Sequence, residues 1–383
     1  GLLVAVGMVL LVGQAPSWVY EYMRAPKIVP LEKKEGVLDP RPVGCVDVLW
    51  RWASRALMLS QKQRLARFLV PEQFAVGLRA GIEAMAHGLE AEMEGLEGAC
   101  FLSGDVENAF NAVDRAWMLE AVAEVSPELA AAALAMYDGP TRYQYKGKEG
   151  VRVLSTRRGC VQGDPLSMAL FCIAIRAPVK WVASAANAVV SGGEVGPWAE
   201  PVPPVQVQER VQSWVEEARA LAPPRDLEGS HESVSVQPRF YADDGVWRVP
   251  RWLLARMPAL IGLCFAVPRL AMKQEKWEAF APEGPQGPLR QEELGPESVV
   301  RVAEGGMVVA GAPLGDVSAM PAAAVVVGPN SFARQYLAAV VRRAAVMGEA
   351  IAEMPEFAAE SYPARKIALQ LVVDCLKPRF AYF

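Results

Sequence analysis

Three acidic residues occupy places where a side chain can be held in one position. Asp105 follows the short apolar run 99–103 and precedes an expected helix, and Asp243 and Asp244 are adjacent in an expected hairpin at 239–248. Fixed carboxylates supply the hard oxygen ligands that Mg²⁺ takes in octahedral geometry. Two adjacent acids repel one another unless a cation or a basic group offsets their charge. The residue types and their placement therefore predict a site for divalent cations.

Each of these patterns also has a purely structural explanation. An aspartate after a strand is commonly a helix cap or a turn former, and the Asp-Gly pair at 244–245 is a frequent hairpin turn. Between the acids lies a glycine-bearing turn, 158–167, that opens a helix and contains the uncharged polar Gln162. Glycine lets a planar partner approach the backbone closely, whereas the Asp-Pro pair at 164–165 is also an ordinary helix start.

Taken in this order, the three segments resemble the palm motifs of reverse transcriptases, most closely those of non-LTR retrotransposons. The first palm motif of that family matches Asp105 to Arg115, its glutamine-glycine motif matches 162–165, and its YxDD box matches Tyr241 to Asp244. Three ordered matches are far more specific than any one of them. Weaker matches extend the resemblance over nearly the whole chain, at 29–57, 72–83, 272–276 and 311–316.

The resemblance implies an RNA-directed DNA polymerase that extends a primer 3′-hydroxyl by two-metal nucleotidyl transfer. The catalytic and metal-binding acids would be Asp105, Asp243 and Asp244, which would hold two Mg²⁺ ions, or Mn²⁺, together with the Val106 carbonyl. Phe110 would exclude a 2′-hydroxyl and so select deoxynucleotides. The remaining residues implied to contact the nucleotide are Lys34, Arg41, Gln162, Gly163, Tyr241, Ala242 and Lys276.

The fold implied is an α+β right-hand polymerase, with fingers, an antiparallel-sheet palm that carries helices on one face, and a partial helical thumb. We expect the fingers at 1–98 and 118–156, the palm at 99–117 and 157–320, and the start of the thumb at 321–383. A surface insertion rich in Pro, Gly, Glu and Ser is expected within the palm at about 191–237, with at most one helix. This insertion is longer than the family pattern, and Lys273 stands where the family commonly has Asn.

Local sequence signals predict the elements around these motifs. Helical spacing of apolar residues covers 50–69 and 80–93, and Ser126 followed by a proline predicts a helix that stops at 138–140. A hairpin is expected at 141–155, and further helices are expected at 166–182, 205–221, 250–265, 331–354 and 362–375. The apolar opening 1–12 is too short to span a bilayer, has no basic region before it, and is interpreted as a buried helix.

Composition sets the limits on partners. With 52% apolar residues the chain should fold, and its 39 Lys and Arg against 43 Asp and Glu require local basic clusters to bind nucleic acid. Such clusters lie at 33–34, 51–67 and 157–158, and each is equally explained as a solvated face. The scattered cysteines and two histidines form no zinc motif. The expected partners are an RNA template, a DNA or RNA primer and dNTPs, with no membrane.

Two other functions remain open from the sequence. One is a catalytically silent, polymerase-derived scaffold that binds nucleic acid, and the other is a polymerase of the group II intron, retron or telomerase type. Because the chain begins at Gly1 and ends at Phe383 without a polar tail, we expect it to be a piece of a longer polyprotein. The expected location is intracellular, and nuclear if the source is a eukaryotic retrotransposon.

Overall fold

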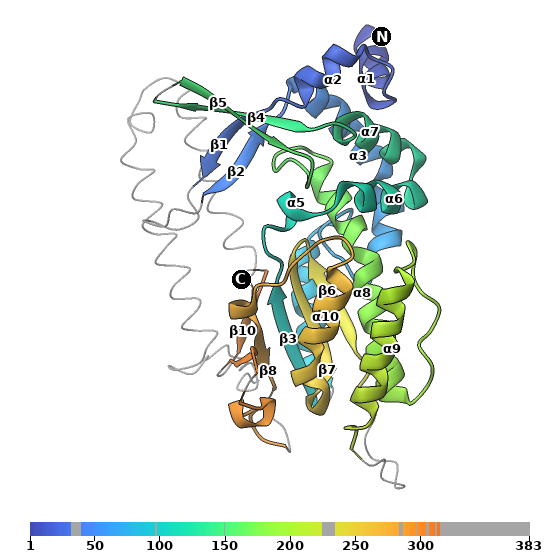
Figure 1. The fold of residues 1–383 in the computed structure, drawn as a ribbon, viewed down its shortest axis with the longest axis vertical. Coiled ribbons are helices and arrows are strands. Elements are labelled where there is room, and N and C mark those ends of the chain that lie inside the picture. Colours follow the sequence, from blue (N-terminus) through green and yellow to red (C-terminus); the bar gives the residue numbers. More distant parts are fainter. Residues whose placement is uncertain are drawn as a thin grey trace, which may run out of the picture.

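The computed structural model describes most of the chain up to Leu314. The described residues are 1–31, 40–95, 98–148, 150–223, 234–282, 286–296, 298–303, 306–310 and 312–314. Lys34, the region 321–383 expected to begin the thumb, and the helices expected at 331–354 and 362–375 lie outside these residues. The described part is a mixed α+β structure built on two larger sheets (Figure 1).

A five-stranded sheet carries the predicted acids. Its strand order is β6-β7-β3-β8-β9, and its strands are β3 (Ala99–Asp105), β6 (Gln237–Tyr241), β7 (Asp244–Pro250), β8 (Glu278–Phe280) and β9 (Arg301–Val302). All neighbours are antiparallel except the edge pair β8–β9, which is parallel. The sheet is therefore mixed, and the expectation of a purely antiparallel sheet is wrong at this edge.

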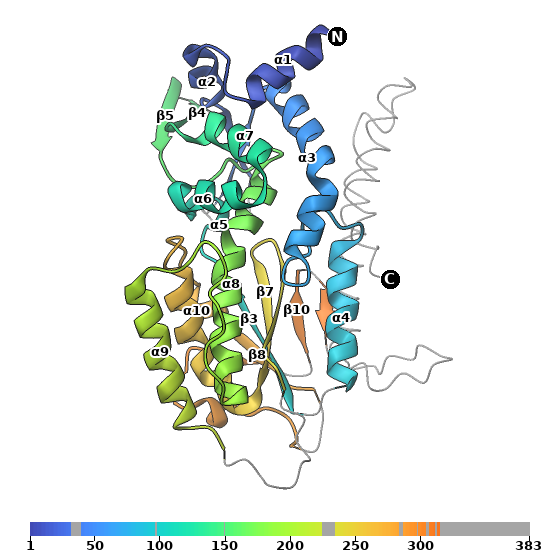
Figure 2. The same ribbon diagram turned by 90° about the vertical axis from the view of Figure 1, so that its right-hand side faces the viewer.

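Both faces of this sheet are buried. Cys100 and Leu102 of β3 belong to the main core, whereas Ala99 and Phe101 belong to a second cluster with Met85. Helix α8 (Ser167–Ser191) and α10 (Met257–Phe265) cover the first face, and α4 (Gly81–Gly95) covers the other, beside β10 (Met307–Val309) and β11 (Ala312–Leu314) (Figure 2). The expectation of helices on one face is therefore wrong. A strand that is apolar at every position, not at alternate ones, is the mark of a sheet covered on both sides.

A smaller four-stranded sheet lies with the N-terminal helices at the other end of the molecule (Figure 1). Its order is β2-β1-β4-β5, from β1 (Lys27–Leu31), β2 (Arg41–Cys45), β4 (Thr141–Gly147) and β5 (Gly150–Thr156). The helices there are α1 (Leu2–Leu11), α2 (Ser17–Met23), α3 (Val48–Leu69), α5 (Ala109–Ala112), α6 (Arg115–Val125) and α7 (Pro127–Tyr137). Ser126 caps α7 as predicted, accepting a hydrogen bond from Leu129 N at 3.2 Å.

Helix α1 is not the buried helix that its composition suggests. Only Gly7, Leu10 and Leu11 are buried, where the helix packs on α3 and α7. Leu2 remains 82% exposed and Leu3 62% exposed. An all-apolar helix buries only the side that meets a neighbour, and here two helices meet one side alone.

Helix α8 is the longest described helix and runs through the core. It begins at Ser167 and continues nine residues past the predicted end at 182, to Ser191, where Gly192 adopts a left-handed conformation with φ of 70°. Among the described residues it alone is long and apolar enough to cross a membrane, but 72% of its apolar window is buried within the protein. A helix that forms the core of a globular protein can have the same length and apolar composition.

The region expected as a surface insertion contributes to the core. Its predicted helix is present as α9 (Val205–Arg219), and the apolar face of α9, with Val211, Trp214 and Val215, packs against α8 and α10. Trp214 Nε1 donates a hydrogen bond to the Arg256 carbonyl at 3.3 Å. The segments on either side of α9 are rich in Pro, Gly, Glu and Ser, and this composition predicted an exposed insertion instead of a packed helix. Three short 3₁₀ helices, η1 (Arg251–Arg256), η2 (Gln274–Lys276) and η3 (Gln291–Leu294), complete the described elements.

Candidate functional site

The predicted acids meet at one end of the five-stranded sheet. Strands β3 and β7 are antiparallel neighbours in a register that places Asp105 directly opposite Asp244. Opposed residues of such a pair have Cα atoms about 4.5–5.5 Å apart. Asp243 lies in the two-residue loop between β6 and β7, because Tyr241 pairs with Asp244. Carboxylates from two distant parts of the chain, Asp105 on one side and Asp243 and Asp244 on the other, therefore share one small region.

The position of the turn between β6 and β7 decides which of the two adjacent acids lies in the loop and which lies in the strand. The loop residues are Ala242 and Asp243, and Ala242 has a left-handed φ of 57°. The Asp-Gly pair at 244–245 lies within β7 and does not form the turn. Gly245 is needed there because a Cβ would stand 2.1 Å from the ring of Phe240. The turn explanation of the Asp-Gly pair is therefore wrong, and Asp244 begins a strand.

Asp105 is held by two lysines. Its Oδ2 accepts hydrogen bonds from Lys273 Nζ at 2.9 Å and from Lys276 Nζ at 2.8 Å. The segment carrying these lysines runs along the end of β3, where Lys273 N donates to the Asp105 carbonyl and Val106 forms a bridge with Met272. Burial alone would raise the pKa of Asp105, but the two lysines outweigh that effect and lower it. The same hydrogen bond raises the pKa of Lys276.

Asp243 and Asp244 behave in the opposite way. Burial first, and the charge of Asp105 after it, raise the pKa of Asp243. The pKa of Asp244 is raised to about 6 by loss of water around the carboxyl group and then by the charges of Asp243 and Asp105, although the residue as a whole is exposed. Within the described part of the chain neither acid has a salt bridge to a lysine or arginine. The turn therefore carries negative charge that its neighbours only partly offset.

A second group of predicted residues lies along β2. Arg41, the first residue of β2, is close enough to the turn that its positive charge opposes the rise in the pKa values of Asp243 and Asp244. The next part of β2 packs on the glutamine-glycine turn, where Gly44 N donates to the Gln162 carbonyl at 2.7 Å. Gly163 has a φ of 110°, and a Cβ on it would stand 2.4 Å from the Gly44 carbonyl oxygen. Only glycine permits this approach.

The first motif is fastened to the same turn. Phe110 is half-buried, and its ring centroid lies 4.7 Å from that of Phe171 on α8. Its carbonyl accepts a hydrogen bond from Cys160 N at 2.7 Å. Arg115, at the end of the motif, is buried and donates to the Gly159 carbonyl at 2.7 Å. The 105–115 segment and the 159–163 turn therefore form one unit.

Two predicted residues have further roles in packing. Asp164 is 5% exposed and accepts hydrogen bonds from Tyr137 Oη, Trp50 Nε1 and Leu166 N. The prediction that Asp164 caps the following helix is wrong, because the N-cap of α8 is Leu166 with no side-chain cap. Asp164 instead joins α3 to α7. Tyr241 is half-buried against the second core cluster, and burial raises its pKa.

Sequence reasoning missed two residues of this region. The sequence pattern presents Lys273 only as a departure from the family and Gln73 only within a weak match, yet Lys273 binds Asp105 and Gln73 contacts Ala242 through both ends of its amide. For Lys273, the available signal was a lysine at a position where the family commonly has asparagine. Nothing local in the sequence indicated the second, because 169 residues separate it from Ala242.

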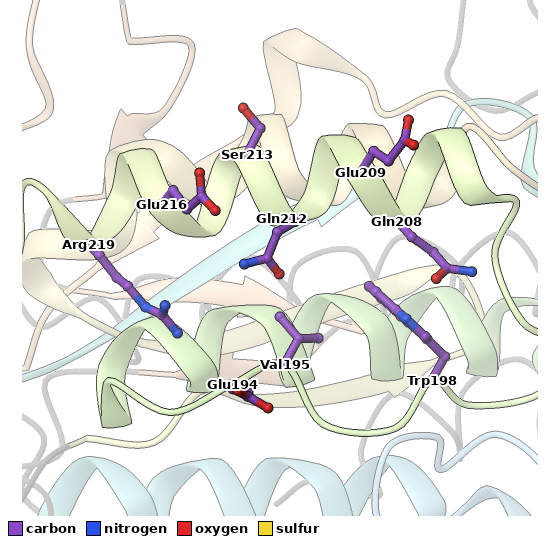
Figure 3. Close-up of a pocket in the computed structure, with 9 residues that line it drawn as sticks. All are labelled: Glu194, Val195, Trp198, Gln208, Glu209, Gln212, Ser213, Glu216 and Arg219. Carbon is purple, nitrogen blue, oxygen red and sulfur yellow. The ribbon is translucent and has the colours of Figure 1, made fainter.

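A large groove lies elsewhere, between α9 and the segment that follows α8 (Figure 3). It has a volume of about 640 Å³, and none of the predicted site residues lines it. Its one basic residue, Arg219, donates to the carbonyls of Ala188 and Gly193, so its charge is directed to the backbone.

Similarity to known proteins is found at the level of structure and not of sequence. No protein-family description and no curated protein matches the sequence. Among solved structures, apo telomerase from Candida tropicalis is similar at 9% identity and a TM-score of 0.41, over 70% of this chain and 45% of the telomerase chain. A form of it truncated from the C-terminal domain is similar at 10% identity and a TM-score of 0.43, over 77% and 54%. The chain thus spans about half the length of these neighbours.

Proposed function

We propose that this chain is an RNA-directed DNA polymerase that extends a primer 3′-hydroxyl with deoxynucleoside triphosphates. The observation that carries the proposal is the pairing of Asp105 with Asp244 across β3 and β7, with Asp243 in the adjoining turn. Acids brought together in this way are expected at an ion site and are costly elsewhere. The ordered sequence motifs, and not the structural neighbours, favour the non-LTR retrotransposon branch.

The donor chemistry of the site fits a divalent cation. Asp105, Asp243, Asp244 and the Val106 carbonyl would hold the two Mg²⁺ ions, which supply charge stabilisation to the attacking and leaving oxygens. In the described residues no three acidic, histidine or cysteine side chains are gathered around one point as ligands. Lys273 and Lys276 instead provide the positive charge next to Asp105. We therefore propose that Asp105 exchanges lysine contacts for the ions when they bind.

The other residues near the site would bind and orient the nucleotide. Arg41, and Lys34 outside the described residues, would pair with the triphosphate, while Gln162 and Gly163 would pack against the nucleotide or template. Lys276 would donate a proton to the departing pyrophosphate. Phe110 would leave no room for a 2′-hydroxyl, so Phe110→Ala should increase ribonucleotide incorporation relative to deoxynucleotide incorporation. An unchanged ratio would exclude that role.

The domain assignment follows from the same proposal. The four-stranded sheet and α1–α3, α6 and α7 would belong to the fingers, at 1–98 and 118–156, and the five-stranded sheet with α8–α10 to the palm, at 99–117 and 157–320. The region 321–383 would begin the thumb. An RNA template and a DNA or RNA primer would then lie across the end of the five-stranded sheet that carries Asp105 and Asp244.

Primer extension on poly(rA) with an oligo(dT) primer and Mg²⁺ tests the proposal. Intact protein should incorporate dTTP, and Asp243→Ala should reduce the rate by roughly 10²- to 10³-fold, the loss typical of removing one preorganised electrostatic group. Asp138→Ala, an exposed acid beyond α7, is the matched control and should retain full activity. Equal incorporation by intact protein and Asp243→Ala would exclude the catalytic assignment.

One observation favours a second function, a catalytically silent scaffold that binds nucleic acid. Asp105 is already neutralised by two lysines, as it would be if no cation were used. A silent scaffold would bind the primer–template without extending it and would show no saturable Mn²⁺ binding. A polymerase must both extend the primer and bind Mn²⁺ saturably. The two assays on one protein preparation therefore distinguish the two functions.

A further inference from the structure

A single buried glutamine holds the turn that carries Asp243. Gln73 lies between α3 and α4 and is 2% exposed. Its Nε2 donates to the Ala242 carbonyl at 3.0 Å, and its Oε1 accepts from Ala242 N at 2.9 Å. The same Oε1 accepts from Phe74 N at 3.1 Å and Ala75 N at 3.2 Å. Every polar atom of the amide is therefore used, and both backbone groups of Ala242 are satisfied by one side chain.

The backbone around Gln73 strengthens this attachment. Phe74 N donates to the Phe240 carbonyl at 2.8 Å, and Phe240 N donates to the Glu72 carbonyl at 2.8 Å. The 72–74 segment therefore lies beside β6, and Gln73 forms an isolated parallel bridge with Phe240. Gln73 is thus fixed to the strand that leads into the turn.

Ala242 requires such support. Its φ of 57° is a left-handed conformation that glycine adopts freely and alanine does not, because the Cβ of alanine approaches the following carbonyl. Ala242 is also only 5% exposed, and a buried peptide group without a hydrogen-bond partner is costly. Without another donor and acceptor, this turn would relax toward a different conformation and move Asp243 and Asp244 with it.

We propose that Gln73 is a positioning residue, which fixes the Ala242 peptide and thereby orients Asp243 and Asp244 for divalent cations. The inference rests on the proposed function for its reference to cations and extends it to a residue outside the three motifs. A group that acts through the ligands in this way typically changes metal affinity or activity by about 10- to 100-fold when it is removed.

The test compares Gln73→Met with a matched control. Methionine keeps the volume of the side chain and loses all four hydrogen bonds. Asn187 offers the control, because it brackets Val236 in the same way, with Nδ2 donating to the Val236 carbonyl at 2.9 Å and Oδ1 accepting from Val236 N at 2.7 Å. Asn187→Leu removes an equivalent amide bracket at the other end of β6.

Three measurements separate positioning from general stability. In intact protein the Ala242 amide should be protected from hydrogen exchange, and in Gln73→Met it should exchange at least about tenfold faster. Mn²⁺ affinity, measured by electron paramagnetic resonance, should weaken about tenfold. In primer extension kcat should fall, because the carboxylate ligands leave their productive positions. Asn187→Leu should change none of these.

A second variant tests the reason for the effect. Glycine at position 242 adopts the left-handed conformation without the steric cost, so Gln73→Met/Ala242→Gly should recover several-fold in Mn²⁺ affinity over Gln73→Met. Unchanged Ala242 exchange or unchanged Mn²⁺ affinity in Gln73→Met would overturn the inference, as would an unprotected Ala242 amide in intact protein. If intact protein neither binds Mn²⁺ nor extends a primer, the proposed function fails, and amide exchange still decides whether Gln73 holds the turn.

Discussion

Two groups of acids in this protein differ in what surrounds them. Asp164 is buried and accepts hydrogen bonds from Tyr137, Trp50 and Leu166. Burial raises its pKa, and these donors oppose the rise. Burial also raises the pKa values of Asp243 and Asp244, but there the neighbouring acids add to the rise. Burial raises the pKa in both regions. The regions differ in what surrounds each carboxylate, which is hydrogen-bond donors around Asp164 and further negative charge around Asp243 and Asp244.

That difference separates a structural acid from a candidate catalytic one. A buried carboxylate with a full set of donors contributes to the folded state, and removing it leaves buried donors unpaired. Carboxylates that repel one another reduce stability and are useful only when a ligand offsets their charge. Asp105 stands between the two cases, because Lys273 and Lys276 already offset its charge.

The largest contrast is expected for Asp243→Asn. The primer-extension rate should fall roughly 10²- to 10³-fold because an anionic ligand is lost, while the midpoint of urea unfolding stays the same or increases because repulsion at the turn is reduced. Extension assays and urea titration on the same preparation measure both. A clear loss of stability would place Asp243 in the structural class with Asp164.

Asp164→Ala should give the reverse result. Tyr137 Oη and Trp50 Nε1 would be left buried without their acceptor, so the free energy of unfolding should fall by about 2–3 kcal/mol. Urea unfolding followed by tryptophan fluorescence measures this. Tyr137→Phe, which removes one donor and leaves the carboxylate, should cost less. An unfolding free energy equal to that of intact protein would show that the three hydrogen bonds are not what holds Asp164.

Lys273→Met tests the intermediate case. Freeing Asp105 of one lysine should tighten Mn²⁺ binding by roughly two- to fivefold, which corresponds to the ~0.5–1 kcal/mol of a partly exposed ion pair. Isothermal titration calorimetry with Mn²⁺ measures the affinity. Lys180→Met, which removes a lysine paired with Glu72, is the control and should have no effect. Weaker binding in Lys273→Met would mean that the lysine supports the ion site instead of competing for it.

The smallest effect concerns pH. Asp244 has a folded-state pKa of about 6, above the ordinary value of about 3.9, so the folded protein binds more protons than the unfolded chain between these values. Its contribution to stability is therefore present below about pH 4 and is lost as pH rises through about 6. In EDTA, intact protein should lose slightly more stability over this range than Asp244→Asn, because the residue is exposed and solvent screens the charges. Mg²⁺ should abolish the difference, and a difference of opposite sign would contradict the raised pKa.

Much of the local structure could be predicted from the sequence. The N-cap of α7, the hairpin of β4 and β5 and the existence of α9 all follow from signals within a few residues of each element, and the structure confirms them. Asp105 at a strand end and Asp243 in a hairpin loop were predicted on the same basis. These features depend on backbone preferences and capping, which neighbouring residues determine.

Other features needed long-range contacts. The apolar run of β3 could not reveal that α4 would cover its second face, and the composition of α1 could not reveal how little of it would be covered. The turn of the β6–β7 hairpin falls at Ala242 and Asp243, two residues before the Asp-Gly pair, and Gln73 holds Ala242 there from 169 residues away. Each outcome was decided by a partner distant in the chain.

The sequence by itself determined which residues could bind cations, the order of the motifs and most helix and strand positions, because residue chemistry and local backbone preference are properties of short segments. Only the tertiary structure decided that Asp105 faces Asp244, that two lysines share the Asp105 carboxylate, and that Gln73 holds Ala242. Strand register and side-chain partners depend on which surfaces pack together, and that is settled by burial over the whole chain.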